Sequence, residues 1–178
     1  MACPVNFTGL NVSYACGELA SGGLKSIYLM NRADVDATVT DGELSFATAP
    51  VAPEVLYLQF NNKDGFSNFT DVKSVAADGT VTAVPTIQIE FLRMKVENRN
   101  ALNSLAIPGA ELVAFVETAA GTIHVVGYEF GLYASSIDGT SGAARSDKNR
   151  YQLTLVGDEN ALALSISALE FDKVVAAA

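Results

Sequence analysis

Histidine and cysteine, on which most catalytic and metal sites depend, are almost missing from this chain. Among 178 residues there is one histidine, His124, and there are two cysteines, Cys3 and Cys16. A single histidine in the apolar segment TIHVVG is more often a packed side chain than a base or a ligand. Two cysteines without neighbouring ligands build neither a disulfide framework nor a zinc site. We therefore expect no enzymatic activity, no metal and no cofactor, and favour reduced thiols over a Cys3–Cys16 bridge.

Charged side chains are scarce, and positive ones are the scarcest. They make up 17% of the chain, with 11 Lys and Arg against 20 Asp and Glu, which gives a net charge of −9. Nucleic-acid-binding surfaces need Lys and Arg to neutralise phosphate, so this balance argues against one. A weakly charged chain that is 49% hydrophobic can tolerate burial among copies of itself, although a large core would also raise the apolar fraction.

Long apolar runs and ligand-binding loops are absent as well. No run approaches the about 20 residues of a membrane helix. The N-terminus MACPVNFTGLNVSYACG lacks a basic segment followed by an apolar one, so we expect no signal peptide, no membrane partner and synthesis in a cytoplasm. Asp34 and Asp36 lack the spacing and closing glutamate of a calcium loop, and GTSG lacks the Gly-Lys-Ser of a phosphate loop.

The most informative stretch that is present is Phe66–Phe91, FSNFTDVKSVAADGTVTAVPTIQIEF. Its central Asp78-Gly79 suits a two-residue hairpin turn, which would place Val72 opposite Pro85. The second arm alternates over about twelve residues, or roughly 40 Å, about twice an ordinary strand. We expect this hairpin to overhang its domain and to be covered by another copy of the chain. The alternative is a pair of shorter strands bent at Pro85, which lacks an N–H.

The rest of the pattern predicts a mainly β fold of α+β character: a single-domain β-sandwich or barrel with the long hairpin and one flanking α-helix. The helix is expected over Lys95–Ala106, where Leu102 and Leu105 share a stripe. Val55–Phe60 has two apolar faces and is expected to be central, and Val174–Ala178 to be a frayed tail. Further strands are expected over Leu24–Met30, Thr38–Ala47 with a break at Asp41-Gly42, Glu111–Thr118, Thr122–Tyr133, Arg150–Val156 and Leu162–Ile166.

Two stretches are expected to lack regular structure. Residues 1–23 are expected to be an extended N-terminal arm. Residues 134–149, ASSIDGTSGAARSDKN, are expected to be a long polar loop, and such loops are usually functional or disordered. With Arg150 at its edge, this loop gathers Arg145 and Lys148 into a positive cluster. The cluster is expected to contact acidic residues of another subunit, and the alternative is a solvated loop.

Three segments together resemble the major tail or tail-tube proteins of tailed bacteriophages. They are GGLKSIYLMNRADV, IQIEF followed by KVENRNALNSLA, and ETAAGTIHVVGYEFGLYASSIDGTSGAARSDKNRYQLTLVGDE, within residues 22–166. The resemblance implies a virion structural protein whose hexameric rings stack into a tail tube that conducts DNA during ejection. Its partners would be other copies of the chain and other tail proteins. A capsid decoration protein, a baseplate component, or a receptor-binding or adhesin module would share most of these traits.

The resemblance and the hairpin pattern also suggest contact residues. A channel wall for DNA would carry carboxylates rather than cations, because cations hold phosphate. Asp71 and Glu90 are expected on one polar face of the hairpin, toward this lumen or simply toward solvent. Glu111, Glu117 and Glu129 are further possibilities. The residues expected at contacts between subunits are Val72, Val81, Ala83, Pro85, Arg145, Lys148 and Arg150.

Overall fold

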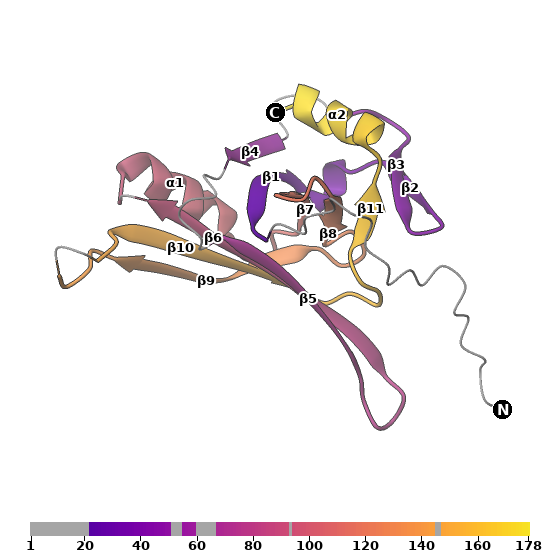
Figure 1. Cartoon of the computed structure of the whole chain (residues 1–178), viewed down its shortest axis with the longest axis horizontal. Helices are drawn as coiled ribbons and strands as arrows, with labels where there is room; N and C mark the ends of the chain where they lie inside the picture. The colour runs from indigo at the N-terminus through magenta and orange to yellow at the C-terminus, as the bar shows by residue number, and fades with distance from the viewer. Residues whose placement is uncertain (1–21, 51–54, 60–66, 93, 145–146) are drawn as a thin grey trace, which may run out of the picture.

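The computed structural model describes residues 22–50, 55–59, 67–92, 94–144 and 147–178. The described part of the chain is mainly β, as predicted, and its strands form one mixed sheet with two α-helices against it (Figure 1). None of its helices is long and apolar enough to cross a membrane. The strands and helices are β1 (Leu24–Asn31), β2 (Ala37–Thr40), β3 (Glu43–Phe46), β4 (Val55–Gln59), β5 (Asn68–Val75), β6 (Val81–Leu92), α1 (Val96–Leu105), β7 (Leu112–Thr118), β8 (Ile123–Val126), β9 (Leu132–Thr140), β10 (Arg150–Gly157), β11 (Leu164–Ile166) and α2 (Ala168–Ala176).

The sheet folds back on itself where β7 meets β9. Its strand order is β2-β3-β11-β8-β7-β9-β10-β6-β5, and β1 lies between β7 and β4. β7 and β9 are joined only at Leu112 and Leu132. The turn before β9 depends on Gly127, at φ 82°, because a Cβ there would lie 2.7 Å from the Leu112 carbonyl oxygen. The fold places the β1–β7–β8 part of the sheet over the β9–β10–β6 part, as in a sandwich.

β7 is buried on both faces by its own chain. Its Leu112, Ala114 and Val116 face β6, β9, β10 and α1 in one core cluster. Val113 and Phe115 face the opposite way, into a second cluster with β3 and α2. Here the second cover is a β-hairpin and a helix of the same chain.

The predicted helix is confirmed as α1, but a second helix was missed. Ser167 caps the N-terminus of α2 by accepting a hydrogen bond from the Glu170 N–H at 3.3 Å. The helix buries Phe171 and Val174 in the second core cluster, and its C-cap residue Ala177 is buried there too. The expectation of a frayed Val174–Ala178 tail is therefore wrong. A Ser three residues before a Glu is a capping signal, and it was overlooked because the apolar stripe spans so few residues.

The prediction of a long loop at residues 134–149 is wrong for its first part. Residues 134–140 belong to β9, which pairs with β10. A register shift beside Thr154 and Leu155 breaks the alternation of side chains, so the strand was hard to recognise. Gly127–Gly131 likewise divides the expected Thr122–Tyr133 strand into β8 and β9. Within the described residues β4 pairs only with β1, which places it at an edge rather than in the centre.

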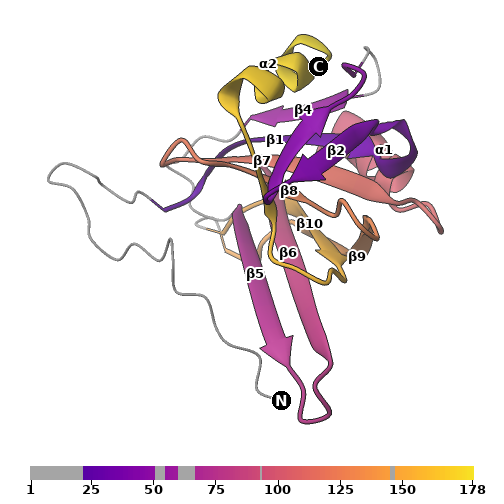
Figure 2. The same ribbon diagram turned by 90° about the vertical axis from the view of Figure 1, so that its right-hand side faces the viewer.

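The long hairpin is confirmed, with a register one residue away from the expected one. Val75 pairs with Val81 and Val72 with Val84. Ala76 donates to the Thr80 carbonyl at 2.8 Å, so the loop is longer than a two-residue turn. A shift of one residue turns every β5 side chain to the other face relative to β6. Figures 1 and 2 show the hairpin projecting from the body on the side opposite α2.

Candidate functional site

The outer part of the hairpin, residues 72–84, extends beyond the rest of the sheet, and we call it the hairpin tip. The β6–β10 ladder ends at Thr86 and Val156. Beyond Pro85, which has no N–H to donate, a single bridge joins Ala83 to Glu159, with N···O distances of 2.7 and 2.8 Å. Past this bridge, no described residue outside the hairpin pairs with either backbone edge of the tip. The tip therefore offers two strand edges for pairing.

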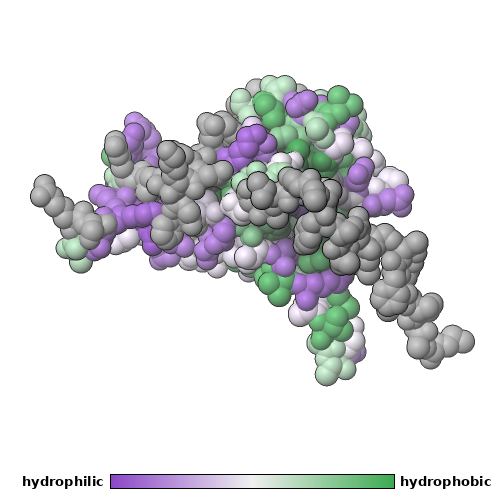
Figure 3. Space-filling model, in the orientation of Figure 1, coloured by the Kyte–Doolittle hydropathy of each residue, from purple (hydrophilic) through white to green (hydrophobic). Residues whose placement is uncertain are grey.

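Valine side chains on the hairpin tip are open to solvent on both of its faces. Val75 and Val81 are a cross-strand pair on one face, 70% and 37% exposed. Val72 lies on the other face and is 60% exposed. Figure 3 shows hydrophobic side chains gathered on the projecting hairpin. The described part of the chain thus leaves these three apolar side chains open to solvent.

The four hairpin residues expected at subunit contacts divide into two pairs. Val72 and Val81 are accessible on the tip. Ala83 is fully buried and Pro85 is buried at the root of the hairpin, where both belong to the interior of their own chain. The corrected register also separates Val72 from Val81 and Pro85, because it places them on opposite faces. Of the four, only Val72 and Val81 are therefore accessible to another subunit.

The positive cluster binds a carboxylate of its own chain. Arg150 and Lys148 pair with Glu90 at 2.7 and 3.4 Å, and the Glu90 side chain is 5% exposed. This contact was missed because Glu90 lies diagonally across the β6–β10 ladder from Arg150, opposite Gln152. Glu90 is therefore enclosed under two cations instead of lying on an open wall. Arg145 lies outside the described residues.

Asp71 and Glu90 lie on opposite faces of the hairpin, contrary to the prediction. Asp71 pairs with Pro85, so the register shift turns it to the face of the buried β6 side chains. Its Oδ2 accepts the Ala163 N–H at 2.6 Å, and its buried Oδ1 has no partner among the described residues. Asp71 thus holds the segment before β11 against the hairpin.

The other three carboxylates considered for a channel wall are also engaged within the chain. Glu111 pairs with Arg32 at 3.0 Å. Glu117 accepts hydrogen bonds from Lys25 and Ser26. Burial raises the pKa of Glu117, but these two donors outweigh that effect and the pKa lies below its ordinary value. Glu129 accepts hydrogen bonds from Asn160, so none of the three side chains stands alone.

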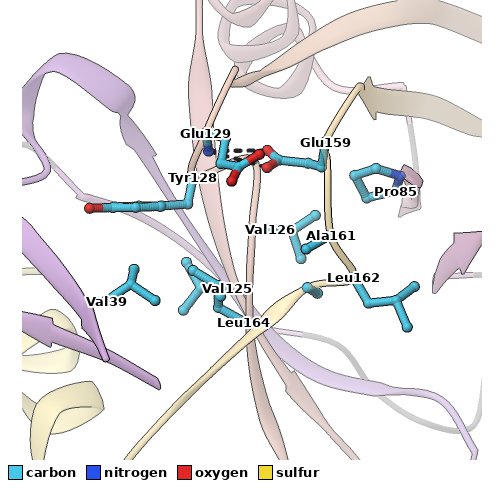
Figure 4. Close-up of a pocket in the computed structure, with 12 residues that line it drawn as sticks. Val39, Pro85, Val125, Val126, Tyr128, Glu129, Glu159, Ala161, Leu162 and Leu164 are labelled. Atoms are coloured by element: carbon cyan, nitrogen blue, oxygen red, sulfur yellow. Dashed lines mark hydrogen bonds between the residues drawn. The ribbon is translucent and has the colours of Figure 1, made fainter. Parts of the chain in front are cut away.

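A groove opens beside the root of the hairpin, and we call it the Glu129–Glu159 groove after the two carboxylates that line it. Its cavity is about 130 Å³. Figure 4 shows the two glutamates close together and aliphatic side chains around the rest of the space. The apolar lining includes Val39, Pro85, Val125, Val126, Leu162 and Leu164. Four strands and the loop before β11 thus build one hollow that is apolar except for its acidic side.

Backbone N–H groups hold the two glutamates in place. The Glu129 N–H lies 3.3 and 3.2 Å from the two carboxylate oxygens of Glu159. Glu129 in turn accepts from the backbone and side-chain nitrogens of Asn160 at 3.1 and 2.9 Å. Burial raises the pKa of Glu159; hydrogen bonds from the Glu129 and Phe130 N–H groups oppose this, and the negative charge of Glu129 adds to it. This arrangement suits a cation beside an aliphatic group.

Sequence reasoning missed this groove. It singled out Glu129 only as a possible acid of a channel wall. The groove forms because the Ala83–Glu159 bridge and the antiparallel β8–β11 pair bring distant segments together. Short apolar and acidic stretches such as GDENALAL have no residue spacing that predicts a groove.

The described residues contain no group of three His, Cys, Asp or Glu side chains arranged to hold a metal ion. His124 packs with its ring centroid 6.0 Å from that of Phe69, as expected for a structural histidine. Cys3 and Cys16 lie outside the described residues. No protein-family model, curated protein or solved structure matches this chain.

Proposed function

We propose that this protein is a self-assembling structural subunit whose hairpin tip packs on a neighbouring copy. The observation that carries the proposal is a projecting hairpin with exposed Val72, Val75 and Val81 and with strand edges that no other described segment pairs. Exposed strand edges can pair with further strands, and the transfer of exposed apolar side chains out of water lowers the free energy. Another copy of the chain is the simplest partner for a surface that every copy carries.

Within this proposal, the copies form the rings of a bacteriophage tail tube. The resemblance to tail-tube proteins supports this reading, as do the sandwich-like fold and the projecting arm. The net charge of −9 supports passage of DNA without adhesion, because few cations are available to hold phosphate. The wall of the channel would have to use acids other than Asp71 and Glu90, since both are engaged within the chain.

The test shortens the arm and leaves its root intact. Ser74 and Thr82 form a cross-strand pair with their hydroxyls 3.1 Å apart, and a two-residue Asn-Gly turn can close there. Replacing Val75–Val81 by Asn-Gly removes the loop and two exposed valines but keeps Ala83 and its bridge. We expect the parent protein to form rings or tubes in electron micrographs and the shortened chain to remain a folded monomer.

Three measurements decide the outcome. Sedimentation gives the mass, circular dichroism shows whether the shortened chain keeps its β content, and micrographs show rings or tubes. A shortened chain that assembles like the parent protein would remove the hairpin from the contact. A parent protein that stays monomeric at high concentration would favour the other reading of the sequence, a binding module that presents its surface to a different molecule.

A further inference from the structure

We propose that the Glu129–Glu159 groove receives the hairpin tip of a second copy, with Val75 and Val81 against its apolar lining and Lys73 beside the two glutamates. This inference rests on the proposed self-assembly and adds the receiving surface to it. Two observations carry it independently of each other. The groove is a largely apolar hollow with two carboxylates on one side, and the tip carries a matching combination of valines and a cation.

We take the docked Val75–Val81 pair from another copy, because the same pair of the groove's own chain lies further out along the arm. Pro85 lines the groove, whereas Val81 lies four residues beyond it toward the turn. At about 3.3 Å per residue, this distance is roughly 13 Å. Figures 1 and 2 show the arm extending straight away from the body instead of folding back.

The shape of the tip fits the groove. Lys73, Val75 and Val81 share one face, because Lys73 pairs with Ala83 and Val75 pairs with Val81. An apolar cavity of about 150 Å³ binds a molecule the size of benzene, so the groove, at about 130 Å³, has room for a branched aliphatic side chain. Leu162 beside it is 51% exposed and would lose water when the tip docks.

The charges of the two surfaces are complementary. Lys73 makes no ion pair within the described part of the chain. The groove presents two carboxylates held close together by the Glu129 N–H. A like-charged pair that is partly out of water is stabilised by a cation placed beside it. Docking would therefore add a second cation to Arg32, which already acts on Glu159, and would give Lys73 a partner.

A contact between a tip and a groove is heterologous, because the two surfaces are different parts of the chain. Every copy then offers one tip and one groove, and each addition leaves a new tip and a new groove free. Such contacts close into rings or continue as filaments, according to the rotation between neighbours. The inferred contact thus produces the kind of assembly that the proposed function requires.

The first test exchanges the charges. Lys73→Glu places an acid opposite the glutamates, and Glu129→Lys places a base opposite Lys73, so each variant alone should need at least about a tenfold higher concentration to assemble. The mixture should assemble again, since residue 73 of each variant then meets a residue 129 of opposite charge on the other. The double variant Lys73→Glu/Glu129→Lys should assemble by itself. If both single variants assemble like the parent protein, the groove does not receive the tip.

The second test does not depend on Glu129→Lys folding correctly. Val75→Cys and Leu162→Cys are made in separate molecules, each with Cys3→Ser and Cys16→Ser, and the two are mixed and oxidised. We expect a disulfide-linked dimer of one variant with the other. The matched control pairs Val75→Cys with Val96→Cys on α1, where the replaced valine is 63% exposed, and should cross-link much more slowly.

The outcomes separate the inference from the proposed function. If the parent protein assembles but Val75→Cys cross-links to Leu162→Cys no faster than to the α1 control, the groove is not the receiving surface and self-assembly stands. A parent protein that never assembles and gives no specific cross-link overturns both. Assembly together with the specific cross-link and the rescued mixture supports both.

Discussion

The hairpin tip and β7 are both built around valine, yet their valines have opposite surroundings. Val113 in β7 is fully buried, whereas Val75 on the tip is 70% exposed. Both segments are regular antiparallel strands, so strand formation does not account for the difference. β7 has a sheet on one face and a β-hairpin with a helix on the other, all from its own chain. Each strand of the tip has only the other strand beside it, so any cover must come from another molecule.

The comparison teaches that an apolar strand pattern does not show whether the rest of the chain covers the strand. Strand β6 makes this clear because its inner half lies in the core and its outer half in the hairpin tip. Ile87 and Ile89 in its inner half are fully buried in the core, and Val81 in its outer half is 37% exposed. The hydrophobic alternation runs through both halves without a change. Four substitutions sharpen or break this comparison, and they are ordered by their expected effect on stability.

The largest loss of stability is expected for Phe115→Ala in β7. Phe115 is fully buried, and its ring lies 5.7 Å from that of Phe46. The cavity left behind should cost about 3–5 kcal/mol, which lowers Tm by roughly 6–20 °C in a domain of this size. Thermal unfolding followed by circular dichroism measures this. Phe130→Ala is the matched control, since Phe130 is 55% exposed; equal losses at the two sites would contradict the burial of β7.

A smaller loss is expected for Glu90→Gln, which removes the charge that anchors the inner half of β6. Arg150 and Lys148 would then lack the carboxylate they pair with, while the shape of the side chain is kept. We expect a loss of about 1–3 kcal/mol, measured by urea unfolding. The control is Glu111→Gln, whose pair with Arg32 is more exposed and should contribute less than about 1 kcal/mol. A Glu90→Gln loss no larger than that of the control would assign the buried pair no anchoring role.

Much of this fold was predictable because its signals are local. Asp41-Gly42 marks the turn between β2 and β3, and Pro108-Gly109 follows α1. The alternation from Thr80 to Phe91 indicated a strand of about twelve residues, and β6 (Val81–Leu92) has twelve. The register of the hairpin was not predictable to one residue, because Asp78-Gly79 fits loops of two and of three residues equally well. That one residue decides which face Asp71 occupies.

The candidate site was less predictable because its parts are distant in sequence. Glu129 and Glu159 meet only when β8, β10 and β6 have taken their places, and no spacing between them reveals it. Glu90 and Arg150 lie 60 residues apart and meet through a β-ladder whose register was unknown. The exposure of Val72 and Val81, by contrast, was predictable from the length of the hairpin alone.

A small gain in stability is expected for Glu159→Gln, at the boundary between the body and the tip. Burial raises the pKa of Glu159 from the ordinary 4.5, and Glu129 adds to this, while the Phe130 N–H and Arg32 oppose it. A raised pKa means that the fold favours the protonated acid. The contribution of Glu159 to stability is thus fully present below pH 4.5 and is lost as the pH rises through the raised value.

Glu159→Gln should therefore have a higher Tm than the parent protein at neutral pH, and this advantage should shrink as the pH falls through the raised pKa toward 4.5 and be absent below 4.5. Thermal unfolding over this pH range tests it, and glutamine still accepts the Glu129 N–H. Asp78→Asn on the tip is the control, because hydrogen bonds from Thr80 lower the pKa of Asp78 and predict the opposite sign. A difference between Glu159→Gln and the parent protein that does not vary with pH would rule out titration of Glu159 as its cause.

The smallest change in stability is expected for Val75→Thr, and this substitution makes the comparison most directly. Threonine keeps the shape of valine and its preference for strands, but it adds a hydroxyl that must be hydrated or hydrogen-bonded. At Val75 the hydroxyl stays in water, so the free energy of unfolding should change by less than about 0.5 kcal/mol. Val113→Thr buries the same hydroxyl and should cost about 1–3 kcal/mol.

Assembly should respond in the reverse order: Val75→Thr should raise the concentration needed for assembly severalfold, whereas Val96→Thr on α1 should leave this concentration unchanged. Sedimentation and thermal unfolding of the three variants decide the matter, because a Val75→Thr protein that assembles normally would show that the exposed valine is not a contact.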